Sequence, residues 1–275
     1  MTVNAITPPS TIGFIGLGNM GYPMAKRLCE AGFKLVVADL NQDTVNRFCS
    51  ENGGLAATNL ADLGRQSRVV ITMLPDGKAV RNVLMAADGV VSGLQNGSVL
   101  LDMSSCSPVD TLVLAQQLKD LGFPLIDAPV SGGVVKAVSG GLAIMAGGDA
   151  DTISALRPLL DPLGKVFLTG GSGSGHAMKA INNFLSATTM AITSEAVIAG
   201  EKFGLDPKTM VDIINASTGR SNSRSEDAQR PIGPQCGAPR NTTILYIRAY
   251  LGHIIQPHEA PVVARTSASV VPRRD

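Results

Sequence analysis

Apolar residues gather in short runs along the first 170 residues of the chain, and polar or glycine-rich stretches separate the runs. The first run spans 12–15 and leads directly into Gly-Leu-Gly-Asn-Met-Gly at 16–21. Apolar residues then recur at helical spacing as far as residue 31, and a second apolar run at 35–38 ends in Asp39. This pattern predicts a strand, a tight turn, a helix and a second strand.

The alternation of strand and helix continues as far as residue 168. Helices are predicted at 43–51 and at 107–122, and the second begins with Ser107 as N-cap and Pro108 in its first turn. Five later apolar runs predict further strands, at 68–74, 98–102, 124–128, 142–146 and 165–168. Such alternation predicts a mostly parallel, doubly wound sheet with helices on both faces, whose ligands bind beyond the carboxyl ends of the strands.

The pattern changes near residue 170, where a stretch rich in glycine and serine precedes a helical pattern without strands. Residues 176–203 are rich in Ala, Met, Ile and Leu, and Asp206 with Pro207 begins a shorter helix. We therefore expect an α/β domain over 1–168, followed over 169–223 by the start of an all-helical domain attached through one long helix.

Composition and charge exclude several classes of function. The formal net charge is only +1, and no basic stretch is interleaved with aromatic residues, so nucleic acid is not expected as a partner. The four cysteines show neither a C-x-x-C pair nor the spacing of a zinc site, so we expect no metal and a reducing compartment. The N-terminus lacks a targeting pattern and the long helix carries polar residues, which predicts a cytoplasmic protein outside the membrane.

The turn at 16–21 has the spacing of a dinucleotide-binding fingerprint. Gly16 permits a sharp turn, Gly18 allows a pyrophosphate to approach the backbone, and Gly21 allows helix and strand to pack closely. The N-terminus of the helix then offers unpaired N–H groups and a positive dipole end to the phosphates. The alternative is a glycine-rich turn in an α/β domain that binds no nucleotide.

The acid that follows the second strand indicates which cofactor is bound. Asp39 can accept hydrogen bonds from both ribose hydroxyls, whereas a 2′-phosphate would meet its negative charge, and no Arg follows at 40–42. We therefore expect NAD, with NADP less favoured. The residues expected to bind it are Gly16, Leu17, Gly18, Asn19, Met20, Gly21, Asp39, Leu40, Asn41, Met73, Leu74 and Pro75.

Three further stretches lie where predicted strands end, and each also has an ordinary structural interpretation. Residues 73–75 would wall the nicotinamide side of the cofactor, or would only end a strand at a turn. Ser104 and Ser105 offer hydroxyls to a ligand, although hydroxyls in this position commonly cap the next helix. Ser131, followed by two glycines, offers a hydroxyl and successive N–H groups to a carboxylate, or forms a glycine turn.

Lys179 is the candidate for acid/base chemistry. A lysine on a helix is ordinarily a solvated cation, but the neighbours of Lys179 at 177, 178, 180 and 181 are apolar. Desolvation favours the neutral amine, as a general acid/base near neutrality requires. Asn183 lies four residues further on the same face and would orient the amine or the substrate. His176 is a weaker candidate because no Ser or Asp lies at the spacing of a triad.

Three motifs occur in one order: the glycine turn at 16–21, Asp-Ala-Pro-Val-Ser-Gly-Gly at 127–133, and Gly-x-Gly-x-x-x-Lys-x-x-x-Asn at 173–183. On these motifs the chain resembles the β-hydroxyacid dehydrogenase family, from about residue 11 to about residue 223. The resemblance implies a Rossmann domain, a helical domain like that of 6-phosphogluconate dehydrogenase, and a dimer or tetramer. The implied reaction is NAD-dependent interconversion of a small 3-hydroxy acid and its semialdehyde.

The resemblance also implies roles for particular residues. It makes Lys179 the catalytic acid/base and places Ser105 near both nicotinamide and substrate. The residues that it implies for substrate binding are Ser105, Ser131, Gly132, Gly133 and Asn183.

Residues 224–275 depart from the family pattern. They hold seven Arg, no Lys and six of the 16 prolines, and the second lysine and the aspartate of the family are not found there. A shifted reading frame or alternative splice would explain this tail, and so would a genuine but divergent, disordered tail. The helical domain is therefore expected to be incomplete, which leaves open a non-catalytic NAD-binding scaffold. An NADPH-dependent reductase of short aldehydes such as glyoxylate or succinic semialdehyde is the other alternative.

Overall fold

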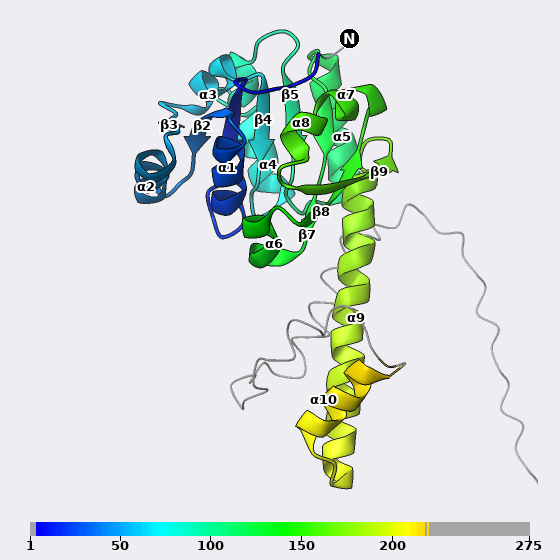
Figure 1. Ribbon diagram of the computed structural model, residues 1–275. Coiled ribbons are helices and arrows are strands. Elements are labelled where there is room, and N and C mark those ends of the chain that lie inside the picture. Colours follow the sequence, from blue (N-terminus) through cyan, green and yellow to red (C-terminus); the bar gives the residue numbers. More distant parts are fainter. Residues whose placement is uncertain (1–3, 218, 220–275) are drawn as a thin grey trace, which may run out of the picture.

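The computed structural model describes residues 4–217 and 219 of the 275-residue chain. In this part a layered α/β domain is followed by one long helix that projects away from the domain, with a short helix packed near its far end (Figure 1). The atypical tail predicted at 224–275 lies outside the described residues.

The α/β domain is built on one nine-stranded sheet. The strand order is β3-β2-β1-β4-β5-β6-β8-β7, with β9 beside β8. The first six of these strands are parallel, whereas β8 is antiparallel to β6 and β7 and parallel to β9. The strands are β1 (Thr11–Ile15), β2 (Lys34–Ala38), β3 (Leu55–Ala56), β4 (Val69–Thr72), β5 (Val99–Asp102), β6 (Leu125–Asp127), β7 (Val130–Ser131), β8 (Leu142–Gly147) and β9 (Gly164–Gly170).

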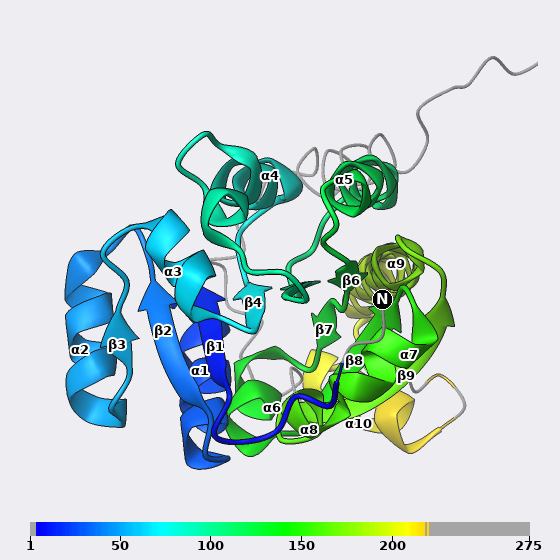
Figure 2. The same cartoon turned by 90° about the horizontal axis from the view of Figure 1, so that it is seen from above.

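Helices cover both faces of the sheet. Helices α4 and α5 lie on one face and α1, α6 and α8 on the other (Figure 2). The predicted fold class, a doubly wound α/β domain followed by helices, is confirmed. The helices are α1 (Gly21–Glu30), α2 (Gln42–Asn52), α3 (Leu60–Gln66), α4 (Gly77–Met85), the 3₁₀ helix η1 (Val90–Gly93), α5 (Pro108–Asp120), α6 (Gly133–Ser139), α7 (Ala150–Ala155), α8 (Arg157–Leu160), α9 (Ser174–Phe203) and α10 (Pro207–Ala216).

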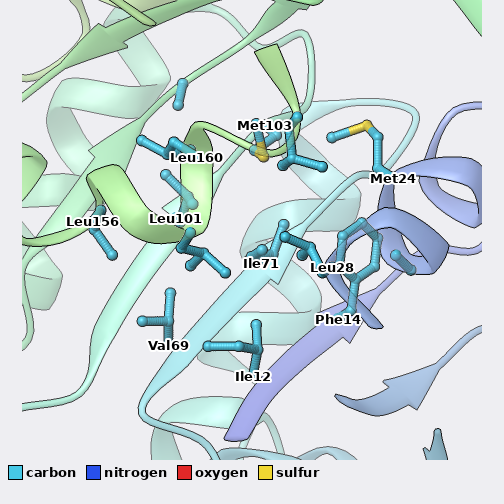
Figure 3. Close-up of a cluster of buried hydrophobic side chains, with 14 of the residues drawn as sticks. Ile12, Phe14, Met24, Leu28, Val69, Ile71, Leu101, Met103, Leu156 and Leu160 are labelled. Carbon is cyan, nitrogen blue, oxygen red and sulfur yellow. The ribbon is translucent and has the colours of Figure 1, made fainter. Parts of the chain in front are cut away.

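The period of two along the strands separates the core into two clusters. Ile12 and Phe14 of β1 point to one face, where they join Met24 and Leu28 of α1 (Figure 3), whereas Ile15 belongs to the cluster on the other face. Both faces of the parallel strands are therefore buried, which explains why their sequences are continuous apolar runs. The core fixes the strand ends, and these carry the candidate site.

Three residues separate the end of β9 from helix α9, which leads away from the carboxyl-end edge of β6 (Figure 1). Its limits are set by Gly173 and Gly204, whose φ angles of 81° and 98° lie in the left-handed region that favours glycine. Helix α10 packs against α9 at Gly200, where a side chain would collide with Met210. Among the described residues, no helix has both the length and the apolar character that crossing a membrane requires.

Candidate active site

The glycine turn joins β1 to α1, and its three glycines have different surroundings. Gly16 has φ of 100°, and a Cβ there would collide with the carbonyl oxygen of Met73. A Cβ on Gly21 would collide with the carbonyl oxygen of Gly16. At Gly18, by contrast, no heavy atom of residues 4–217 or 219 lies within 4 Å of the position that a Cβ would take, and the residue is exposed. The outer glycines therefore permit close packing, while Gly18 leaves bare backbone that a ligand can approach.

The N-terminus of α1 opens onto the same surface. Its N-cap residue, Met20, makes no capping hydrogen bond through its side chain, and the first turn contains no acidic residue. The first N–H groups of a helix have no partner inside the helix, and the dipole places positive charge there. This end of α1 therefore suits a phosphate or pyrophosphate group.

Asp39 lies directly beside the glycine turn, one residue after β2 ends. Its Oδ2 accepts a hydrogen bond from the backbone N–H of Leu17 at 2.6 Å, and its Oδ1 accepts one from Asn41 at 2.8 Å. These bonds fix the carboxylate in place, and a carboxylate has about four acceptor positions, so it can still bind ribose hydroxyls. The next residue, Leu40, is fully exposed. The residues present thus fit a dinucleotide at both its pyrophosphate and its ribose.

Residues 73–75 follow β4, and the structure brings them against the glycine turn through the carbonyl oxygen of Met73. The backbone N–H of Leu74 donates a hydrogen bond to the Ser104 hydroxyl at 2.9 Å. Ser104 is buried and Ser105 is exposed. Neither is the N-cap of α5, because Ser107 fills that position. Of the two serines, Ser105 is therefore the one that a ligand could reach.

Ser131 lies at the end of β7, opposite Ala143 of β8. The next residue, Gly132, has φ of 132° and acts as the N-cap of α6 without a capping side chain, and Gly133 has φ of 65°. These backbone conformations favour glycine, and they leave the hydroxyl and the following N–H groups at a chain reversal. Such successive N–H groups form a concave surface that suits a carboxylate.

Lys179 and Asn183 lie in the second and third turns of α9. Lys179 is half-buried, and burial lowers the pKa of its amine from the ordinary value of a lysine. His176, which lies three residues before Lys179, contacts the carbonyl oxygen of Ser104 through Nε2 at 3.1 Å. The structure thus brings α9 next to the segment that carries Ser105. Asn183 lies one turn further along the helix.

The sequence alone did not reveal a buried polar cluster at the start of α9. Asp102, Cys106 and His176 each place one possible metal-ligand atom within 4.8 Å of the others. Their spacing of four and then 70 residues matches no short metal motif, so nothing in the sequence pattern indicated it. The cluster is explained by hydrogen bonds: the Cys106 thiol donates to Asp102 at 3.3 Å, and both ring nitrogens of His176 have partners among the described residues.

Family models match both parts of the chain. The model described as the NAD binding domain of 6-phosphogluconate dehydrogenase matches residues 11–171. The chain belongs to the β-hydroxyacid dehydrogenase family. A second model, described as NAD-binding of NADP-dependent 3-hydroxyisobutyrate dehydrogenase, matches residues 173–241. This match extends past residue 223, where the resemblance was expected to end.

Individual relatives agree with this membership. The chain is 39% identical over 230 residues to mitochondrial 3-hydroxyisobutyrate dehydrogenase of Mus musculus, covering 83% of this chain and 68% of that protein. It is 37% identical over 209 residues to the NAD-dependent L-serine dehydrogenase of Pseudomonas aeruginosa, covering 76% and 70%. Among solved structures, Mycobacterium tuberculosis 3-hydroxyisobutyrate dehydrogenase with L-serine has a TM-score of 0.75 at 31% identity, covering 89% and 84%.

Members of the β-hydroxyacid dehydrogenase family are NAD(P)-dependent oxidoreductases that act on the CH–OH group of hydroxy acids, and this chain is one of them. The predicted enzyme class and the dinucleotide cofactor are thereby confirmed. The glycine turn, Asp39 and the N-terminus of α1 fit that cofactor on the geometry described above.

Proposed function

We propose that the chain oxidises a small 3-hydroxy acid, of the 3-hydroxyisobutyrate class, to its semialdehyde with NAD, and that Lys179 is the general acid/base. The observation that carries the proposal is the position of Lys179. Its amine is desolvated, and its helix starts where β5 and β6 end, at the edge that also carries the glycine turn. The names of two relatives, 3-hydroxyisobutyrate dehydrogenase and L-serine dehydrogenase, support a hydroxy acid of three or four carbons as the substrate class.

The proposed roles divide the reaction among the residues of this edge. The glycine turn, the N-terminus of α1 and Asp39 hold the dinucleotide, which supplies the carbon that accepts hydride. The Ser131 hydroxyl and the N–H groups of Gly132 and Gly133 bind the carboxylate of the substrate. The amine of Lys179 removes the proton of the hydroxyl group as the carbonyl forms, and in the reverse direction the ammonium group returns it. Ser105 and Asn183 orient the substrate beside Lys179.

Fixing the reacting groups accounts for much of the proposed rate enhancement. A positioned general base typically contributes about 10²- to 10⁴-fold, and holding two reactants in alignment contributes more. The carboxylate site on the turn at 131–133 would supply that alignment, because the carboxylate does not change during the reaction. Its binding energy can therefore serve to place the alcohol carbon.

The proposed preference for NAD over NADP predicts the behaviour of Asp39→Asn. The amide keeps one oxygen to accept a backbone hydrogen bond but removes the negative charge that a 2′-phosphate would meet. We expect the ratio of kcat/KM with NADP to kcat/KM with NAD to rise by about tenfold, which corresponds to about 1.4 kcal/mol of removed repulsion. Initial-rate kinetics with both cofactors measure this ratio.

Asp43→Asn is the matched control for Asp39→Asn. Asp43 is an exposed acid in the first turn of α2, and its substitution removes one negative charge, as Asp39→Asn does. It should leave the ratio unchanged. An equal change in both variants, or none in either, would show that Asp39 does not select the cofactor. A wild-type protein that prefers NADP would support the NADPH-dependent reductase instead.

A spectrophotometric screen tests the proposed function itself. Purified full-length chain is incubated with 3-hydroxyisobutyrate, glycerate, threonate, 3-hydroxypropionate or L-serine and NAD or NADP, and reduced cofactor is followed by its absorbance. We expect NADH formation with at least one of these acids. If calorimetry shows that the chain binds NAD but none of the hydroxy acids is oxidised, the chain is a non-catalytic scaffold. If activity is found only with NADPH and glyoxylate or succinic semialdehyde, the chain is the reductase.

The assembly of the chain is a further part of the proposal. Helix α9 exposes large apolar side chains along much of its length, which supports burial against another copy in a dimer or tetramer. The exposed apolar side chains of α9 are Met178, Ile181, Phe184, Leu185, Met190, Ile192, Ile198 and Phe203. Light scattering coupled to size-exclusion chromatography measures how many copies of the chain assemble.

A further inference from the structure

The N-terminus of α9 is held by a residue from another element. Its own N-cap residue, Gly173, has no side chain to accept the first N–H groups. Asp127, at the end of β6, does so instead: its Oδ1 accepts the N–H of Gly173 at 2.7 Å, and its Oδ2 accepts the N–H of His176 at 2.9 Å. Asp127 is completely buried. Burial raises the pKa of the Asp127 carboxyl, whereas the N–H groups of His176 and Gly173 favour its charged form. The two hydrogen bonds connect the first turn of α9 to the end of β6.

The His176 side chain makes a second connection between α9 and the sheet. It is completely buried, and its Nε2 lies 3.1 Å from the carbonyl oxygen of Ser104, just beyond β5. A carbonyl oxygen only accepts hydrogen bonds, so Nε2 carries a proton and donates. On the other side of the ring, Nδ1 lies 2.8 Å from the hydroxyl of Thr111 on α5. The imidazole therefore joins three elements through two directed bonds.

The backbone of α9 also packs closely against the sheet at Gly175. A Cβ on Gly175 would collide with the carbonyl oxygen of Met145 in β8 and would lie 2.7 Å from that of Asp127. The backbone of α9 is thus in direct contact with the sheet between the two polar connections. Lys179 follows His176 by three residues, which is about 4.5 Å along the helix axis and on the same face.

We propose that Asp127 and His176 are positioning residues that together hold the first turn of α9 and thereby set the place and the desolvation of the Lys179 amine. The inference rests on the proposed role of Lys179 and extends it to two residues that do not touch the substrate. A purely apolar contact would bury the same surface but would not fix the rotation of the helix. The two polar contacts of the imidazole and the two hydrogen bonds to the carboxylate do fix it. A displacement of about 1 Å in a reacting group can lower the rate about 10²-fold.

Two substitutions of His176 separate positioning from filling of space. In His176→Gln, the amide N–H can still donate to the carbonyl oxygen of Ser104, and the amide oxygen keeps a polar group facing the Thr111 hydroxyl. In His176→Leu, the volume is similar but neither bond forms. We expect Gln to keep kcat within about threefold and Leu to lower it about 10- to 100-fold, while the affinity for NAD changes less than about twofold in both.

A second measurement reports on Lys179 without using catalysis. The pH dependence of its reaction with a small amine-acylating reagent is followed by mass spectrometry of the peptide that contains it. Because burial lowers the pKa of Lys179, loss of the anchoring should raise its apparent pKa towards that of a solvated lysine. We expect this rise in His176→Leu and an unchanged profile in His176→Gln.

Ser98→Ala is the matched control for loss of a buried hydrogen bond. The Ser98 hydroxyl is also completely buried and donates to the carbonyl oxygen of Ser67 at 3.1 Å, but it lies just before β5, at the opposite end of that strand. The Ser98→Ala substitution should lower the melting temperature and leave both kcat and the pH profile of Lys179 acylation unchanged. Parental kcat and an unchanged Lys179 profile in His176→Leu would overturn the inference, as would equal effects in the Gln, Leu and Ser98 variants.

The two proposals fail in different ways. If the wild-type chain oxidises no hydroxy acid, the proposed function fails, whereas the Lys179 profile still decides whether His176 positions the amine. The wild type could instead be active while His176→Leu keeps the parental kcat and the parental pH profile of Lys179. In that case the proposed function stands and the positioning role is refuted.

Discussion

Replacing Lys179 with alanine is expected to lower kcat for hydroxy-acid oxidation by about 10²- to 10⁴-fold, the usual contribution of a positioned general base. The substitution removes the proposed proton acceptor and leaves the glycine turn and Asp39 intact. The Kd for NAD should therefore change less than about twofold, since weakened cofactor binding is not what the loss of a base produces. Initial rates at saturating NAD and calorimetric titration of NAD measure the two quantities separately.

The direction of the pH dependence follows from the same assignment. Oxidation requires the neutral amine, so kcat/KM should rise with pH through the pKa of Lys179 and fall as the amine becomes protonated at lower pH. Burial lowers that pKa, and the rise should therefore be centred below the range of a solvated lysine. Reduction requires the protonated amine and should show the opposite slope. In Lys179→Ala, both dependences on this group should disappear.

Lys202 offers a matched control on the same helix. It lies in the last turn of α9 and is exposed, so Lys202→Ala removes a lysine from α9 without altering the edge of the sheet. This variant should keep parental kcat and the parental pH profile. A Lys179→Ala enzyme that turned over as fast as the Lys202 variant would rule out Lys179 as the acid/base.

Features determined by neighbouring residues could be predicted from the sequence. The strand, turn, helix and second strand around 16–21 follow from apolar spacing and glycine chemistry, and the structure places Asp39 beside that turn. The parallel part of the sheet follows from the alternation of strand and helix, because a crossover helix brings the next strand back in the same direction. Local pattern was sufficient wherever the contacts are made within one such unit.

Features that depend on distant residues could not be predicted in this way. Apolar spacing contains no information on strand direction, so the antiparallel pairing of β8 was not visible, and β3 and β7 have only two residues each. The hydrogen bonds of Asp127 to Gly173 and of His176 to Ser104 span 46 and 72 residues. In the sequence, Asp127 is the first residue of the motif at 127–133 and His176 is a weak candidate base, because the partners of both lie far away along the chain.

The largest effect on cofactor binding is expected from Gly18→Val. Gly18 is exposed, and in the part of the chain that the structure describes no heavy atom lies within 4 Å of a Cβ placed there, so we expect the fold to accept valine. The same open surface is where a pyrophosphate would approach the N-terminus of α1, and the valine methyl groups would occupy it. Displacing charged hydrogen bonds worth about 2–3 kcal/mol should raise the Kd for NAD about 30- to 150-fold.

Two other glycines test whether this loss is specific to the cofactor site. Gly171 is also exposed, and no heavy atom of the described residues lies within 4 Å of a Cβ placed there, so Gly171→Val should change neither the melting temperature nor the Kd for NAD. Gly21→Val should lower the melting temperature, because its Cβ collides with the backbone of Gly16 and α1 must move. We expect the free energy of unfolding to fall by about 1–3 kcal/mol. Calorimetric titration and thermal denaturation without NAD measure both effects. If Gly18→Val bound NAD as tightly as the parent, or lost binding only together with its thermal stability, the pyrophosphate would not lie against Gly18.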